Sequence, residues 1–194
     1  RTAAQMYGGH ADWDAIRNLK DHLRQLNTPV LGNGDIWTGS DALEMMARTG
    51  ADGVVVGRGC LGRPWLFSQL TAAFAGEELP TEPRLGRVLQ ILRRHAELLT
   101  LDYGEAKGCR DMRKHMSWYL KGFSVAHTVR QALGTVQTLA EIDALVAQID
   151  SDQAFNSEVG SGPRGRTSGS RRPALPDRWL ETCELTADDR VNVS

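Results

Sequence analysis

Two glycine-rich turns carry residue types that bind phosphate groups. The first is Asn33-Gly34-Asp35, the second is Gly57-Arg58-Gly59, and each follows a short apolar run. Glycines let backbone N–H groups approach an anion closely, and an arginine adds a charge-assisted hydrogen bond. The two turns together predict a phosphate site. The alternative is that both are plain connections between a strand and a helix.

The elements that position these turns form a predicted βαβ unit. The runs at 29–31 and 51–56 are continuously apolar, which is typical of buried parallel strands. Between them lies a helix-sized segment, with Thr38 and Asp41 in capping-box spacing and Gly50 at its end. Because the loops after the last two strands of a (β/α)8 barrel frequently bind phosphate, this unit suggests the end of such a barrel.

The chain changes character after a linker at 76–83. Helical periodicity predicts helices at 12–26 and 61–75 before the linker, and a small bundle of four helices, at 85–99, 108–122, 125–133 and 139–149, after it. Residues 156–173 are rich in Gly, Ser, Pro and Arg, which predicts a flexible, disordered linker. We therefore expect three parts: a barrel part at 1–76, a helical part at 77–150 and a flexible tail at 151–194.

A basic face is predicted on the second helix of this bundle. Between Arg84 and Lys121 there are nine Lys and Arg against four Asp and Glu. Lys114, Trp118 and Lys121 have the i, i+4, i+7 spacing of one helix face, next to Arg113. Cations interleaved with aromatic rings suit a phosphate backbone and unstacked bases. The alternative is a solvated basic face over core aromatic residues.

Composition sets the outer limits. The chain has 194 residues and a net charge of -1, which gives no global attraction to nucleic acid. Cys60, Cys109 and Cys183 are scattered and odd in number, which favours a reducing cytoplasm over a disulfide framework, and no metal-site spacing occurs. No apolar run is long enough for a membrane helix. A complete barrel needs roughly 250 residues, so we expect only the C-terminal part of one here.

Five stretches of the chain resemble the tRNA-dihydrouridine synthase family of bacteria. They are RTAAQMYGGHADW at 1–13, PVLGNGDI at 29–36, TGADGVVVGRG at 49–59, GRPWLF at 62–67 and RKHMSWYLKG at 113–122. The resemblance implies an α/β fold, the C-terminal part of an FMN-binding (β/α)8 TIM barrel, followed by a helical tRNA-binding domain. The two strands would be the seventh and eighth of the barrel.

The family's activity is the NADPH-dependent reduction of specific uridines in tRNA to 5,6-dihydrouridine. By resemblance, Asn33, Gly34, Asp35, Gly57 and Arg58 would bind the FMN phosphate, while Arg1, Arg113, Lys114 and Lys121 would contact RNA. The family's catalytic cysteine lies upstream of this chain, so no catalytic residue is assigned. We expect a monomeric, cytoplasmic protein that is inactive as this fragment. Two alternatives stay open: another phosphate-binding barrel oxidoreductase, and a non-catalytic tRNA-binding remnant.

Overall fold

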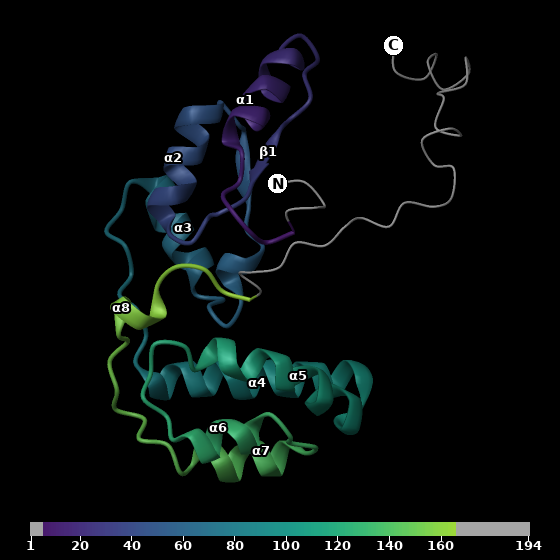
Figure 1. The fold of residues 1–194 in the computed structure, drawn as a ribbon, viewed down its shortest axis with the longest axis vertical. Coiled ribbons are helices and arrows are strands. Elements are labelled where there is room, and N and C mark those ends of the chain that lie inside the picture. Colours follow the sequence, from purple (N-terminus) through teal and green to yellow (C-terminus); the bar gives the residue numbers. More distant parts are fainter. Residues whose placement is uncertain (1–5, 166–194) are drawn as a thin grey trace, which may run out of the picture. The chain divides into compact units, whose positions relative to one another are not determined.

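The computed structural model describes residues 6–165 of the chain. The described residues from His10 onward belong to one compact unit. Strands and helices alternate in its first part, and Figure 1 shows their order. The elements of this part are α1 (Trp13–His22), β1 (Leu31–Asn33), α2 (Gly39–Thr49), β2 (Gly53–Val55), the 3₁₀ turn η1 (Arg58–Cys60) and α3 (Leu66–Ala75).

The predicted βαβ unit is present. β1 and β2 pair in parallel, with Leu31 opposite Gly53 and Asn33 opposite Val55, and α2 connects them. The capping box at the start of α2 forms as predicted: the Thr38 hydroxyl accepts from the Asp41 N–H at 3.2 Å, and the Asp41 carboxylate accepts from the Thr38 N–H at 2.9 Å. This arrangement is consistent with part of a (β/α)8 barrel.

Element ends differ from the predictions by a few residues. β1 begins at Leu31 rather than at Pro29, so Asn33 is the last residue of the strand and not part of the turn. α1 stops at His22 instead of near Leu26, because the chain tightens there and the Leu26 N–H bonds the Leu23 carbonyl at 2.9 Å. The Asp12 cap is as predicted, since its carboxylate accepts from the N–H groups of residues 14 and 15.

A small apolar cluster holds the α/β part together. Met45 of α2 and Leu66 of α3 are fully buried in it, with Ile36, Ala42 and Leu70. Trp13 and Ile16 of α1, Val54 of β2 and Val56 just after β2 pack against it. Burying a side chain such as Leu66 contributes about 2 kcal/mol to the stability of the fold. The cluster therefore fixes the positions of the two strands and of the turns that follow them.

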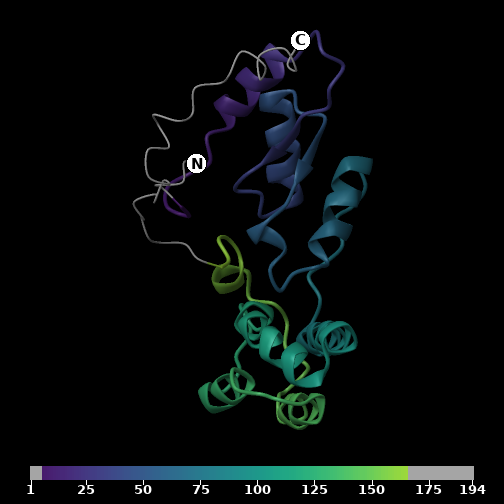
Figure 2. The same ribbon diagram turned by 90° about the vertical axis from the view of Figure 1, so that its right-hand side faces the viewer.

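The described residues after α3 form helices only. They are α4 (Leu85–Tyr103), α5 (Glu105–Tyr119), α6 (His127–Leu133), α7 (Leu139–Val146) and the one-turn α8 (Ser157–Gly160). Figure 2 shows α4 to α7 gathered around one another. Their shared core includes Leu92 of α4, Met112 of α5, Leu133 of α6 and Ile142 of α7, all fully buried. The four predicted helices are therefore found, within a few residues at their ends.

Residues 156–165 differ from the predicted flexible linker. Asn156 caps α8 through its side chain, and the Arg164 side chain is only 2% exposed. The guanidinium of Arg164 donates to three backbone carbonyls, which compensates for the low apolar content on which the prediction rested. The remainder of the predicted tail, from residue 166, lies outside the described residues.

Within residues 6–165, no helix is both long and apolar enough to cross a membrane. In that same range there is no group of three or more His, Cys, Asp or Glu side chains arranged to hold a metal ion.

Candidate functional site

The two glycine-rich turns meet through Asp35 and Arg58. Asp35 follows β1 and Arg58 follows β2, and parallel pairing brings these ends to one edge of the sheet. The Arg58 guanidinium lies 3.3 Å from the Asp35 carboxylate, and both side chains are largely buried, with 16% and 14% of their surface exposed. A largely buried ion pair of this kind is held in one orientation better than a surface pair.

Further contacts fix the geometry of this pair. The Asp35 carboxylate also accepts from the Ala11 N–H at 2.6 Å, and the Trp13 indole donates to the Gly34 carbonyl at 2.9 Å. The guanidinium carbon of Arg58 lies 5.2 Å from the centre of the Trp37 ring, within cation–π range. Segments on both sides of the strands therefore hold Arg58 in place.

The turn after β2 borders open space beside a cationic side chain. A methyl group added at Gly57 would meet no atom within 4 Å, so the backbone there borders open space. Beside that space stand the start of η1 and the cationic Arg58. Asp35 is itself an anion and accepts from Arg58, so its carboxylate suits the orientation of Arg58 rather than direct contact with a phosphate. The Asn33 side chain donates to the Val55 carbonyl at 2.7 Å and steadies the end of β1.

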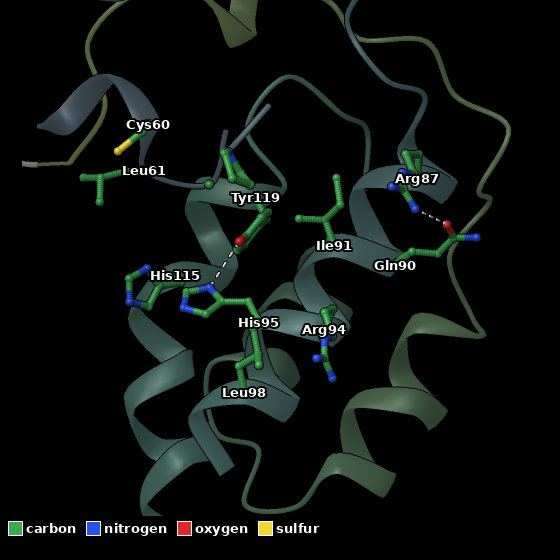
Figure 3. Close-up of a pocket in the computed structure, with 12 residues that line it drawn as sticks. Cys60, Leu61, Arg87, Gln90, Ile91, Arg94, His95, Leu98, His115 and Tyr119 are labelled. Atoms are coloured by element: carbon green, nitrogen blue, oxygen red, sulfur yellow. Dashed lines mark hydrogen bonds between the residues drawn. The ribbon is translucent and has the colours of Figure 1, made fainter. Parts of the chain in front are cut away.

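A cavity of about 520 Å³ lies between α4, α5 and the turn at 60–64. Figure 3 shows His95 of α4 and His115 of α5 pointing toward it beside Tyr119. The Tyr119 hydroxyl and Nδ1 of His95 share a hydrogen bond of 3.1 Å. The His115 ring meets the edges of the His95 and Trp118 rings, with centroids 4.8 and 5.0 Å away. Arg87 and Arg94 also line the cavity.

The cavity holds neutral rings at neutral pH. Burial, with smaller contributions from His95 and Lys114, lowers the pKa of His115 to about 4. Burial also lowers the pKa of His95 and raises that of the Cys60 thiol, and it raises the pKa of Tyr119 to about 12. Neutral imidazoles and a phenol can donate and accept hydrogen bonds and can stack, which suits a planar, uncharged polar group.

Comparison with known proteins places the chain in a family. A family model described as dihydrouridine synthase (Dus) matches residues 1–159. The chain belongs to the dihydrouridine synthase family. The resemblance noted from the sequence motifs is thereby confirmed, and it covers both the turns after β1 and β2 and the helices α4 to α7.

Several proteins named tRNA-dihydrouridine synthase are similar to this member of the dihydrouridine synthase family. Proteins named "Probable tRNA-dihydrouridine synthase" from Mycobacterium tuberculosis (strain H37Rv) and Mycobacterium leprae are each 54% identical over 180 residues, which is 93% of this chain and 46% of theirs. The "tRNA-dihydrouridine synthase B" of Pasteurella multocida is 36% identical over 136 residues, 70% of this chain and 40% of that protein. The chain thus spans about half the length of these curated relatives.

The residues predicted to contact RNA have different surroundings in this dihydrouridine synthase chain. Lys114 is exposed on α5. Arg113 is partly buried, and its Nε donates to the Val136 carbonyl at 2.8 Å. Lys121 lies beyond the end of α5, because the helix stops at Tyr119, and its ammonium donates to the Ser161 and Pro163 carbonyls at 3.2 and 2.9 Å. Arg1 lies outside the described residues.

The predicted single helix face of Lys114, Trp118 and Lys121 is therefore interrupted before Lys121. Sequence reasoning also missed the cavity around His95 and His115, which depends on the packing of α4 against α5. The residue string around Lys114 contains His115 and Tyr119, but nothing local pairs them with His95 on another helix. The role of Trp37 beside Arg58 was missed for the same reason.

Proposed function

We propose that the protein to which this chain belongs reduces uridines of tRNA to 5,6-dihydrouridine, using FMN and NADPH. The observation that carries the proposal is the convergence of Asp35 and Arg58 at one edge of a parallel sheet, in a chain of the dihydrouridine synthase family. The names of the relatives support the same substrate.

In this proposal the turns at 33–35 and 57–58 hold the phosphate of FMN. Arg58 donates to the phosphate, the backbone at Gly34 and Gly57 approaches it, and Asp35 and Asn33 keep the two turns in register. When bound, the flavin supplies hydride chemistry that no side chain can perform. The role of this chain is to bind and orient it.

The RNA face proposed here centres on Lys114, with Arg1, Arg113 and Lys121 as further contacts. Lys114 is exposed, which supports a direct contact with the phosphate backbone. Arg113 and Lys121 already donate to backbone carbonyls, so their contribution includes holding α5 and the segment after it.

The test uses the native protein in full, purified and mixed with FMN, NADPH and an unmodified tRNA transcript. We expect bound flavin and NADPH-dependent conversion of uridine, measured by mass spectrometry of nucleosides. Arg58→Ala should weaken FMN binding by about tenfold or more, because it removes a charge-assisted contact from a partly buried site.

Arg24→Ala is the matched control. Arg24 also pairs with a carboxylate, that of Asp21 at 2.6 Å, but it is exposed and lies on the segment after α1. It should bind FMN as the wild type does. A native protein that binds no flavin and converts no uridine would overturn the proposed function. Equal FMN affinity in the Arg58→Ala variant and the wild type would overturn the phosphate site.

A further inference from the structure

The segment at 160–165, which we name the strap, lies beyond residue 159, where the family match ends. The side chains of the strap offer little apolar surface. Even so, Arg164 is as buried as a core residue, with 2% of its surface exposed. Burying an arginine is costly unless the charge finds close partners. The contacts of the Arg164 guanidinium must therefore offset the cost of burying its charge.

Arg164 joins three separate segments of the chain. One terminal nitrogen donates to the Leu61 carbonyl at 3.3 Å and to the Trp118 carbonyl at 2.5 Å, and the other donates to the Gly160 carbonyl at 3.1 Å. Leu61 follows η1 in the α/β part, whereas Trp118 belongs to the last turn of α5. A single planar guanidinium can span such acceptors, and a lysine ammonium cannot match that fork.

The strap also touches the proposed phosphate turn. A methyl group added at Gly165 would lie 3.0 Å from Leu61 and 3.8 Å from the Cγ and Cδ atoms of Arg58, so the strap backbone packs on the stem of that arginine. Lys121, just after α5, ties the strap from the other side through the carbonyls of Ser161 and Pro163. The strap is thus held by both regions that it connects.

The charged groups near Arg164 determine whether its guanidinium keeps its charge. Arg63 is nearby and 5% exposed, and it is neutralised by Glu82, which also accepts from the Trp65 indole at 2.6 Å. Burial and the neighbouring Arg63 lower the pKa of Arg164 to about 10, so it stays charged at neutral pH. Its Nε atom is buried and has no hydrogen-bond partner among the described residues. The hydrogen bonds that offset the burial of the guanidinium are therefore those from its two terminal nitrogens to the three carbonyls.

We propose that Arg164 is a positioning residue, which fixes the turn that carries Arg58 against the C-terminal end of α5. The strap thereby holds the flavin-phosphate turn and the RNA face of α5 in one arrangement. This inference rests on the proposed function for its consequence in FMN binding. Its structural content, the immobilisation of residues 57–62 by the strap, does not depend on that function.

The experiment compares Arg164→Lys and Arg164→Ala with wild type in the native full-length protein. Two quantities are measured: amide hydrogen exchange in peptides that cover 57–65 and 115–121, and FMN affinity by fluorescence quenching. We expect exchange in both segments to rise, and FMN to bind about tenfold more weakly, because binding must then order the turn that carries Arg58. Lysine keeps the charge, so that variant serves if alanine prevents folding.

Arg130→Lys is the matched control. Arg130 is partly buried and likewise donates to three carbonyls, those of Leu120, Phe123 and Val125, but it does not reach the α/β part. It should leave exchange at 57–65 and FMN affinity unchanged. The inference is overturned if the Arg164 variants leave exchange at 57–65 at the wild-type level, or if Arg130→Lys raises it equally. If no variant binds FMN, including wild type, the proposed function fails, and the exchange result still decides the role of Arg164.

Discussion

At the scale of the residue, His115 shows how burial sets a protonation state. Its ring stands between the edges of the His95 and Trp118 rings, and the nearby Lys114 also disfavours a positive charge. Asp111 opposes this effect but is the smallest of the influences on it. The pKa of His115 therefore falls to about 4, and its imidazole is neutral near pH 7.

This shift predicts an acid-sensitive contribution to stability. In the unfolded chain a histidine has a pKa near 6.5, so between that pH and about 4 the unfolded state binds a proton that the folded state does not. The free energy of unfolding should fall as the pH falls through this window. Above about pH 6.5 it should not depend on the protonation of His115. In His115→Gln, the decrease in urea midpoint from about pH 7 to about pH 5 should be smaller than in wild type.

His127→Gln is the control for this prediction, because His127 is exposed on α6. Its stability should fall between the two pH values as much as that of wild type. An identical fall in all three proteins would contradict the assignment of a depressed pKa to His115. The acid sensitivity that remains in the stability of His115→Gln would come in part from His95, because burial also lowers the pKa of that histidine.

Local signals decided which residues could be predicted. The Thr38 and Asp41 capping box and each of the two glycine-rich turns are local signals, each contained within four consecutive residues, so sequence spacing found them. The interruption before Lys121 could not be found, because α5 ends at Tyr119 with no proline or other local stop at 120. The burial of Arg164 could not be predicted either, because the carbonyls of Leu61 and Trp118 that accept from it are distant in sequence.

At the scale of elements, the turn after η1 lies in close contact with helix α5. Gly62 has a φ of +65°, and a methyl group there would lie 2.3 to 2.6 Å from backbone atoms of Trp118 and Tyr119. No side chain could be accommodated without moving one element from the other. This contact places Leu61 within reach of the Arg164 guanidinium and brings the cavity walls together.

Gly62→Ala should therefore destabilise the protein far more than Gly76→Ala. Both glycines have a left-handed φ, +65° and +69°, but a methyl group at Gly76 would meet no atom within 4 Å. Alanine at Gly76 should cost about 1 kcal/mol of unfolding free energy for its backbone strain, and alanine at Gly62 about 3 kcal/mol in total. Urea unfolding of both variants measures the difference. Equal costs would show that the turn and α5 are not packed closely in solution.

At the scale of the whole molecule, the α/β part presents apolar strand residues to solvent. Leu31 of β1 is 55% exposed and Val55 of β2 is 45% exposed, although both lie in strands of the type that parallel sheets bury. The sheet has two strands in the described part of the chain, and each has one edge without a paired strand there. The curated relatives are about twice as long as the region that matches this chain, so those proteins contain further residues beyond that region.

We therefore expect the 194-residue chain by itself to bind FMN at least about tenfold more weakly than the native full-length protein, and to reduce no tRNA. The proposed phosphate turns are present in it, but its described part supplies only two strands, each with one unpaired edge, and so only part of the wall of a (β/α)8 barrel. Fluorescence titration of FMN with both proteins, in one buffer, measures the ratio. Tight, stoichiometric flavin binding by the chain alone would contradict this expectation, because it would mean that Arg58 and its neighbours are fully organised by residues 6–165 without further strands.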